Sequence, residues 1–328
     1  MYKVEVDATP SINCFTGSLE KLFEIKRVKV TECELLACSG GFLLEAGLDE
    51  WQMPELTFSV EKVGLVGARA YGGDLKRIPI AEKWREQLRQ LLKKEVGVIV
   101  WVNSCWLDYA DVYSQKTGYL HAILVTGISD NGEWVHIVDS LIVDRVPWAC
   151  NATLRADVFE KACTARVRSE AHDHMGYYWV MRISHKQTGL AIRDAIIVQA
   201  NQFLATARFN GAVREYKSLN LALLRGEDEQ AVRAARRIFD HIVVLYIIPG
   251  LLLLEDALVM GKFNIETIEQ LRLLRKAWHA LSIMALKYEA TLSPAVLERI
   301  ELRFDDIQQL TLVLWKNISS DQLYKRKI

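Results

Sequence analysis

The sequence lacks an excess of charge of either sign. It contains 41 Lys and Arg residues and 41 Asp and Glu residues among 328, and no basic block marks a surface that could follow a phosphate backbone. It also lacks a glycine-rich phosphate loop, because the segments GLVG and GGDLK match neither the Walker nor the dinucleotide pattern. We therefore expect no nucleic-acid partner and no cofactor.

Paired cysteines are missing as well. The six cysteines stand at irregular spacings without a CxxC pair, so the sequence predicts no disulfide framework and favours a reducing compartment. Residues 1–13 have no positively charged start followed by an apolar run, which a signal peptide would require. We expect a cytoplasmic protein.

No uninterrupted apolar run is long enough to cross a membrane. The nearest approach, residues 241–260, is interrupted by Pro249-Gly250 and carries Glu255 and Asp256, whereas a span needs about 20 apolar residues. This stretch predicts a buried core helix or an oligomer interface, so a homodimer is compatible with the sequence and a membrane partner is not expected.

The chain changes character at about residue 184. Before that point strand and helix patterns alternate, whereas beyond it five stretches with helical periodicity follow one another without strand signals. A chain of 328 residues with 51% hydrophobic side chains is sufficient for two cores. The sequence therefore predicts an α+β fold with a mixed domain over residues 1–184 and an all-helical domain over residues 185–328.

Within the mixed domain, several elements are defined by their patterns. Residues 80–94 have the periodicity of an amphipathic helix, and residues 96–102 (VGVIVWV) indicate a buried strand. Four glycines punctuate residues 64–74, which predicts a loop. Residues 143–148 are interpreted as a further strand or turn.

The most informative stretch is residues 117–140 (TGYLHAILVTGISDNGEWVHIVDS). Two segments rich in apolar and β-branched residues flank Asp130-Asn131-Gly132, which predicts an antiparallel hairpin. His121 opens the first strand and Asp139 closes the second. Because these ends meet across the hairpin, the carboxylate can orient the imidazole, as a general base requires.

A nucleophile for such a base is available far upstream, at Cys14. Leu19, Leu22, Phe23 and Ile25 have helical spacing, and Ser11 or Asn13 can cap the start of this helix, so Cys14 falls in or just before its first turn. A cysteine in the first turn lies at the positive end of the helix dipole, beside unpaired N–H groups that favour a thiolate and can receive an oxyanion. The alternative interpretation, a small buried hydrophobic residue, is less compatible with the matched His/Asp hairpin.

Other polar residues are weaker candidates. Cys105 is the rival nucleophile, but it follows a strand and lacks the N–H groups of a helix start. Asn103 either lines a cleft or satisfies a turn, and Tyr109 is interpreted as core or pocket wall.

No metal site is predicted. His172 and His174 beside Glu170 resemble a ligand cluster, but residues at i and i+2 point to opposite faces of a strand, so a polar loop is the better interpretation. His136 shares a strand with Asp139 and falls on the opposite face, where we expect it to be structural.

Taken together, these motifs resemble a known family. Asn13-Cys14 at a helix start, the segment VIVWVNSCWLDY, and HAILVTG from His121 with Val138-Asp139 are similar to the butirosin biosynthesis BtrH N-terminal domain family, a branch of the papain-like cysteine folds. The resemblance covers roughly residues 10–183. A helical region often follows this domain, as it does here.

The resemblance implies a papain-like fold and an acyltransferase of natural-product (antibiotic, secondary-metabolite) biosynthesis. An acyl group on the phosphopantetheine thioester of an acyl or peptidyl carrier protein would pass to Cys14 and then to a small-molecule amine. His121 would be the general base and acid, and Asp139 its orienting carboxylate. Related folds use a Gln before the cysteine in the oxyanion hole; none precedes Cys14, which leaves Asn13 or backbone N–H groups as the substitute.

Three functions therefore remain open. The first is the amide-forming acyltransferase. The second is a hydrolase on the same site, such as a cysteine peptidase, an amidase or a thioesterase. The third is a non-catalytic binding or assembly protein. The sequence predicts the same site for the first two, and whether water or an amine accepts the acyl group depends on the shape and dryness of the cleft.

Overall fold

The computed structural model describes residues 2–49, 51–114, 118–144, 146–167, 173–184 and 191–321. The fold is α+β, as predicted, with an antiparallel sheet and a helical C-terminal region. The contacts divide the chain into two units, Met1–Leu35 with Val60–Thr188 and Leu36–Ser59 with Gly189–Ile328. The segment Leu36–Ser59 thus groups with the C-terminal helices, whereas the sequence-based division placed it in residues 1–184.

The first unit is built on one antiparallel sheet. Its strands, in spatial order, are β4 (Gly73–Pro79), β9 (Tyr177–Ile183), β5 (Val98–Asn103), β6 (Leu120–Ile128), β7 (Trp134–Ile142) and β8 (Trp148–Arg155), and β1 (Tyr2–Lys3) pairs with β6. β5 is buried along its whole length and lies next to β6 at the centre of the order. The predicted hairpin is present as β6 and β7, joined by a turn in which Gly132 has φ +74°.

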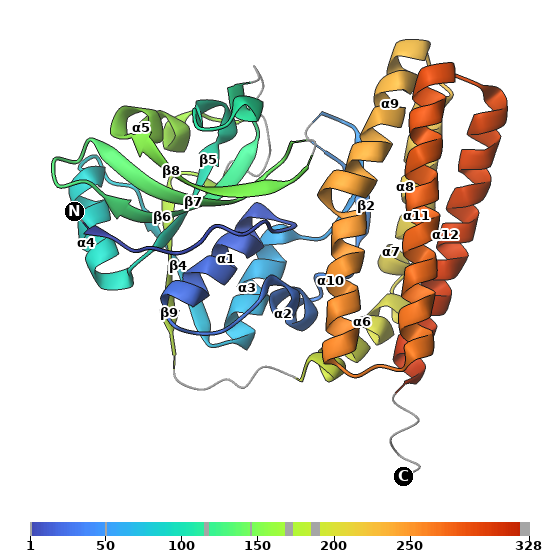
Figure 1. Ribbon diagram of the computed structural model, residues 1–328, viewed down its shortest axis with the longest axis horizontal. Coiled ribbons are helices and arrows are strands. Elements are labelled where there is room, and N and C mark those ends of the chain that lie inside the picture. Colours follow the sequence, from blue (N-terminus) through green and yellow to red (C-terminus); the bar gives the residue numbers. More distant parts are fainter. Residues whose placement is uncertain are drawn as a thin grey trace, which may run out of the picture. The chain divides into compact units, whose positions relative to one another are not determined.

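Helices cover both faces of this sheet (Figure 1). α1 (Cys14–Ile25) and α3 (Val60–Ala70) pack on one face, and α4 (Trp84–Glu95) and α5 (Ala156–Thr164) pack on the other. Successive residues of a strand point to opposite faces, so the fully apolar central strands supply both cores at once. The helix predicted at 80–94 is present but begins at Trp84, with Trp84, Leu88 and Leu92 buried.

The prediction of a loop over residues 64–74 was wrong. These residues form most of α3 and the start of β4. Gly64 and Gly67 allow close packing, because a Cβ on Gly64 would lie 2.4 Å from Phe15 of α1 and one on Gly67 would lie 2.9 Å from the backbone oxygen of Leu35. Gly72, with φ +78°, does form the turn between α3 and β4. Glycine lowers intrinsic helix propensity, but here the helix gains contact with α1 in return.

The strand expected at 143–148 begins later, at Trp148, and runs to Arg155 as β8. β8 lies at the edge of the sheet and buries one residue fully, Leu154. An exposed edge strand carries no hydrophobic alternation, so its sequence gives little strand signal.

The second unit consists of a helical bundle and a small two-stranded hairpin. Its helices are α6 (Ile192–Ala205), α7 (Ala207–Asn210), α8 (Ala212–Leu224), α9 (Asp228–Asp240), α10 (Ile247–Met260), α11 (Ile265–Thr291) and α12 (Pro294–Ser320). The helical periodicity predicted these stretches. The strands β2 (Glu45–Leu48) and β3 (Pro54–Thr57) were not predicted. α11 and α12 are neighbours along their length (Figure 1), and Trp278 and Phe304 meet between them with ring centroids 6.3 Å apart.

The stretch Asp228–Met260 is, among the described residues, the one helical segment with the length and composition of a membrane span. It is interrupted by a π-helical turn, His241–Leu245, before Pro249. Glu255 forms ion pairs with Arg272 and Arg275 of α11. These contacts join α10 to α11, but only Ile247, Leu254, Ala257 and Leu258 of α10 are buried, so the structure does not decide between a core helix and an oligomer interface.

Candidate active site

The first turn of α1 presents Cys14. Asn13 is the N-cap, with extended backbone angles (φ −145°, ψ 136°), and its Oδ1 accepts hydrogen bonds from the N–H groups of Phe15 (2.9 Å) and Thr16 (3.3 Å). An asparagine cap of this kind explains why the helix begins at Cys14. The cysteine is thereby fixed at the positive end of the helix, as the sequence predicts.

His121 and Asp139 come together across the β6–β7 hairpin. Leu124 pairs with Val138, and His121 and Asp139 are each an odd number of residues from that pair, so both side chains leave the sheet on the same face. His121 Nε2 lies 2.9 Å from Asp139 Oδ1, and the side chains are 2% and 0% exposed. The geometry that the hairpin predicts for this pair is therefore present.

Cys14 meets the imidazole at the start of β6. The N–H of Ala122, the residue after His121, donates to Cys14 Sγ over 3.4 Å. The Cys14 side chain is also close enough to the imidazole to contribute to the raised pKa of His121. Nε2 of the ring is engaged by Asp139, so Nδ1 is the ring nitrogen that remains for a further partner. Cys14 thus lies at the start of β6 beside the His121–Asp139 pair, from which it is separated by more than a hundred positions in the sequence.

Two tyrosines that the sequence interpretation did not assign to the site complete it. Tyr109 Oη and Tyr113 Oη each donate to Asp139 Oδ2 over 2.7 Å. The N–H of Leu141 donates to Oδ1 over 3.0 Å, so the buried carboxylate accepts four hydrogen bonds in all. Tyr109 is therefore more than core or pocket wall. A buried tyrosine hydroxyl requires a hydrogen-bond partner, but the sequence does not indicate which residue that partner is.

The electrostatics of this cluster favour the charged pair. Burial lowers the pKa of His121, but Asp139 and, to a smaller extent, Cys14 raise it by more than burial lowers it. The resulting pKa is about 10, above the usual value. Burial raises the pKa of Asp139, but the His121 charge and the hydrogen bonds from His121 and the tyrosines hold it below its usual range. At neutral pH the site therefore contains an imidazolium and a carboxylate.

The backbone N–H of Cys14 is the donor left free at this turn. Its neighbours are engaged: the N–H groups of Ile12 and Asn13 by the Glu32 carboxylate, those of Phe15 and Thr16 by Asn13 Oδ1, and that of Gly17 by Asn13 O. Within the described part of the chain, the Cys14 N–H and the Asn13 Nδ2 have no acceptor. Both are suitable donors for an oxyanion at the nucleophile.

The remaining candidates lie in other environments. Asn103 Oδ1 accepts from the N–H of Cys105 (3.1 Å) and its Nδ2 donates to Arg166 O (3.3 Å), so its side chain closes a turn after β5. Burial raises the pKa of the Cys105 thiol. His136 lies on the sheet face opposite to Asp139, where its Nδ1 is 3.2 Å from Thr153 Oγ1.

The segment with Glu170, His172 and His174, whose sequence pattern favours a polar loop, falls partly outside the described residues, which include neither Glu170 nor His172. The rings of His174 and Trp101 are in a tilted contact, with centroids 5.4 Å apart, and His174 Nε2 is 3.4 Å from Glu61. Among the residues that the structure describes, no group of three His, Cys, Asp or Glu side chains could hold a metal ion.

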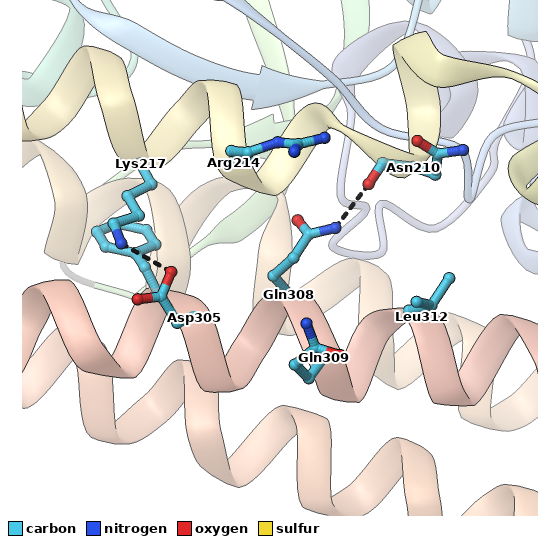
Figure 2. A pocket seen from close by; sticks show the side chains of 8 residues that line it. Asn210, Arg214, Lys217, Asp305, Gln308, Gln309 and Leu312 are labelled. Carbon is cyan, nitrogen blue, oxygen red and sulfur yellow. Dashed lines mark hydrogen bonds and ion pairs between the residues drawn. The ribbon is translucent and has the colours of Figure 1, made fainter.

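The helical unit contains a separate groove of about 450 Å³ between α8 and α12 (Figure 2). It is lined by Asn210, Arg214, Lys217, Phe304, Asp305, Gln308, Gln309 and Leu312. Gln308 donates to the backbone oxygen of Asn210 (2.6 Å), and Lys217 pairs with Asp305 (2.7 Å). No cysteine or histidine lines it, so it lacks the nucleophile and base present at Cys14.

Searches with the whole sequence find no matching family model and no significant match among curated proteins. The resemblance to the BtrH N-terminal family therefore stays a prediction, as do the roles that it implies for Cys14, His121 and Asp139. The chemical argument for the site consequently rests on its geometry.

Proposed function

We propose that this protein is a cysteine-dependent acyltransferase with a papain-like first domain. The observation that carries the proposal is the position of the Cys14 thiol: it opens a helix and accepts the N–H of Ala122, next to the His121 imidazole that a fully bonded, buried carboxylate holds in place. A thiol in this setting is suited to accept an acyl group, since a base lies beside it and the helix start offers N–H donors to the oxyanion. The acyl donor would be a thioester on the phosphopantetheine arm of a carrier protein.

The reaction can be followed atom by atom. The Cys14 thiolate attacks the thioester carbonyl, forming an S–C bond and an oxyanion that the Cys14 N–H receives. Collapse of this intermediate breaks the bond to the pantetheine sulfur, which takes the proton from the His121 imidazolium. Neutral His121 then removes a proton from the incoming amine as it attacks the acyl-enzyme, and expulsion of Cys14 Sγ completes the amide.

Asp139 keeps the imidazole oriented through these steps. The two tyrosine hydroxyls and the Leu141 N–H support the carboxylate, so it remains ionised while the ring gains and loses its proton. General acid–base catalysis of this kind typically contributes about 10²–10⁴-fold to the rate.

The proposal is tested by incubating the purified protein with a panel of acyl-pantetheine thioesters and recording its intact mass. We expect a mass gain equal to the acyl group, lost in Cys14→Ala and kept in Cys105→Ala. An adduct that survives in Cys14→Ala would overturn the assignment of the nucleophile. If an uncharged alkylating reagent also modified Cys14 no faster than the other cysteines, the non-catalytic function would be favoured.

A second measurement separates transfer from hydrolysis. The acylated protein is isolated and divided between buffer and a panel of primary amines. Amide formation that outruns release of the free acid supports the acyltransferase, whereas release at the same rate with and without amines supports the hydrolase.

A further inference from the structure

A buried glutamate grips the turn that carries Cys14. Glu32 is the first residue of α2 (Glu32–Ser39) and is 5% exposed. Its Oε2 accepts from the N–H of Ile12 (3.0 Å), and its Oε1 accepts from the N–H of Asn13 (3.2 Å) and from Thr16 Oγ1 (2.5 Å). The three donors lie on either side of Cys14 in the chain, so one carboxylate ties both flanks of the cysteine.

This arrangement is costly for the fold. Burial raises the pKa of Glu32 to about 7, although the hydrogen bonds from Thr16 and Ile12 lower it. Among the described residues, no Lys or Arg forms an ion pair with it, and its acidic neighbour Glu20 accepts the Glu32 backbone N–H over 2.6 Å. A carboxyl group kept inside without a cationic partner loses hydration that only its hydrogen bonds replace.

Glu32 fixes the conformation of the backbone before Cys14. With its N–H held, Asn13 keeps the extended angles that turn its Oδ1 back over the next two N–H groups. The Cys14 N–H is then the donor without an acceptor at the start of α1. Without Glu32, the N–H groups of Ile12 and Asn13 would need other acceptors, and the backbone angles of this turn would no longer be fixed.

We propose that Glu32 is a positioning residue that holds the Cys14 N–H in the direction of the developing oxyanion. It touches neither the thiol nor the substrate, so its effect is exerted through the Ile12–Thr16 backbone. This inference rests on the proposed acyl-transfer function and deepens it, because it separates two properties of the site. Thiol reactivity belongs to Cys14 and His121, whereas stabilisation of the tetrahedral intermediate depends on Glu32.

The two properties can be measured on the same protein with two reagents. Acylation by a thioester passes through an oxyanion, whereas alkylation by iodoacetamide at Cys14 forms a S–C bond at a saturated carbon and needs no oxyanion donor. Glu32→Gln keeps the size of the side chain but replaces one carboxylate oxygen by an NH2 group. A backbone N–H that donates to this oxygen in the parent protein would then face a second donor. We expect acylation of Cys14 to slow about 10²-fold, the effect of losing one oxyanion donor, with alkylation changed less than about 3-fold.

Glu34→Gln is the matched control. Glu34 lies on the same helix, and its carboxylate accepts the N–H and hydroxyl of Thr31 (2.8 and 2.9 Å) without reaching α1. We expect both rates to stay within about 2-fold of the parent. If circular dichroism shows that Glu32→Gln does not fold, Thr16→Val takes its place, because this substitution removes a single donor to Glu32. Acylation of Thr16→Val should slow about 3- to 10-fold, with alkylation unchanged.

Three results would count against the proposal in distinguishable ways. Parent-like acylation in a folded Glu32→Gln or Thr16→Val variant overturns the positioning role. Acylation and alkylation that fall together assign Glu32 to general support of the helix and also overturn it. If the parent protein is alkylated at Cys14 but accepts no acyl group from any thioester, the proposed function fails and this inference fails with it.

Discussion

His121 should stabilise the folded parent protein more at low pH than at high pH. Replacing Asp139 by Asn should reverse this dependence of the free energy of unfolding on pH. Burial lowers the pKa of His121, and Asp139 and Cys14 raise it to about 10, above the unfolded value of about 6.5. Such a group stabilises the folded state fully below pH 6.5, and the contribution is lost as pH rises toward the folded pKa. In Asp139→Asn the main raising charge is absent, so burial dominates and the imidazole opposes folding when it protonates at low pH.

The expected magnitude follows from the burial and bonding of the pair. His121 and Asp139 are 2% and 0% exposed, and removing one partner of a buried ion pair costs about 3–5 kcal/mol. That cost applies at pH 5, where His121 would carry a charge without its partner. At pH 9 a neutral imidazole leaves only mismatched hydrogen bonds, about 1–3 kcal/mol. Asp139 has a depressed pKa, so its own contribution is lost only in acid, below this window.

The measurement is urea unfolding at pH 5, 7 and 9 in a Cys14→Ser background, which removes the thiol's effect on His121. Asp157→Asn is the control, because Asp157 is exposed and its one ion pair within the described part of the chain is with exposed Arg155, so its loss should cost less than about 0.5 kcal/mol at every pH. NMR titration of the His121 ring gives a direct comparison. A stability difference for Asp139→Asn that does not grow as pH falls would refute the charged-pair assignment.

Three further substitutions test how the site is built. Gly17→Ala should destabilise by about 1–3 kcal/mol in thermal unfolding and slow Cys14 modification, because a Cβ there would lie 2.3 Å from Ser11 Oγ and 2.8 Å from Ser140 Cβ and push α1 off β7. Asn13→Ala should cost about 1 kcal/mol through loss of the N-cap, and unchanged stability would contradict the capping geometry. Gly132→Ala should cost about 1–2 kcal/mol, since φ is +74° in the hairpin turn, and it should leave Cys14 alkylation at the parent rate.

Local patterns predicted the parts of the site that depend on neighbours in sequence. The turn at Asp130-Asn131-Gly132 and the apolar segments beside it determine the β6–β7 hairpin, and the period of two then places His121 and Asp139 on one face. Asn13 as a cap determines where α1 begins and hence that Cys14 opens it. The helical periodicity beyond residue 190 predicted the bundle in the same way.

Tertiary structure decided which groups surround those residues. Tyr109 and Tyr113 reach Asp139 from 30 and 26 positions away, and Glu32 reaches Asn13 from 19 positions away. The sequence records that these side chains need hydrogen-bond partners, but many partners would satisfy them equally. The glycines of α3 show the same limit, since their spacing suggests a loop until Phe15 fills the space beside Gly64. Periodicity therefore specifies which face of an element is buried, and packing alone specifies what that face meets.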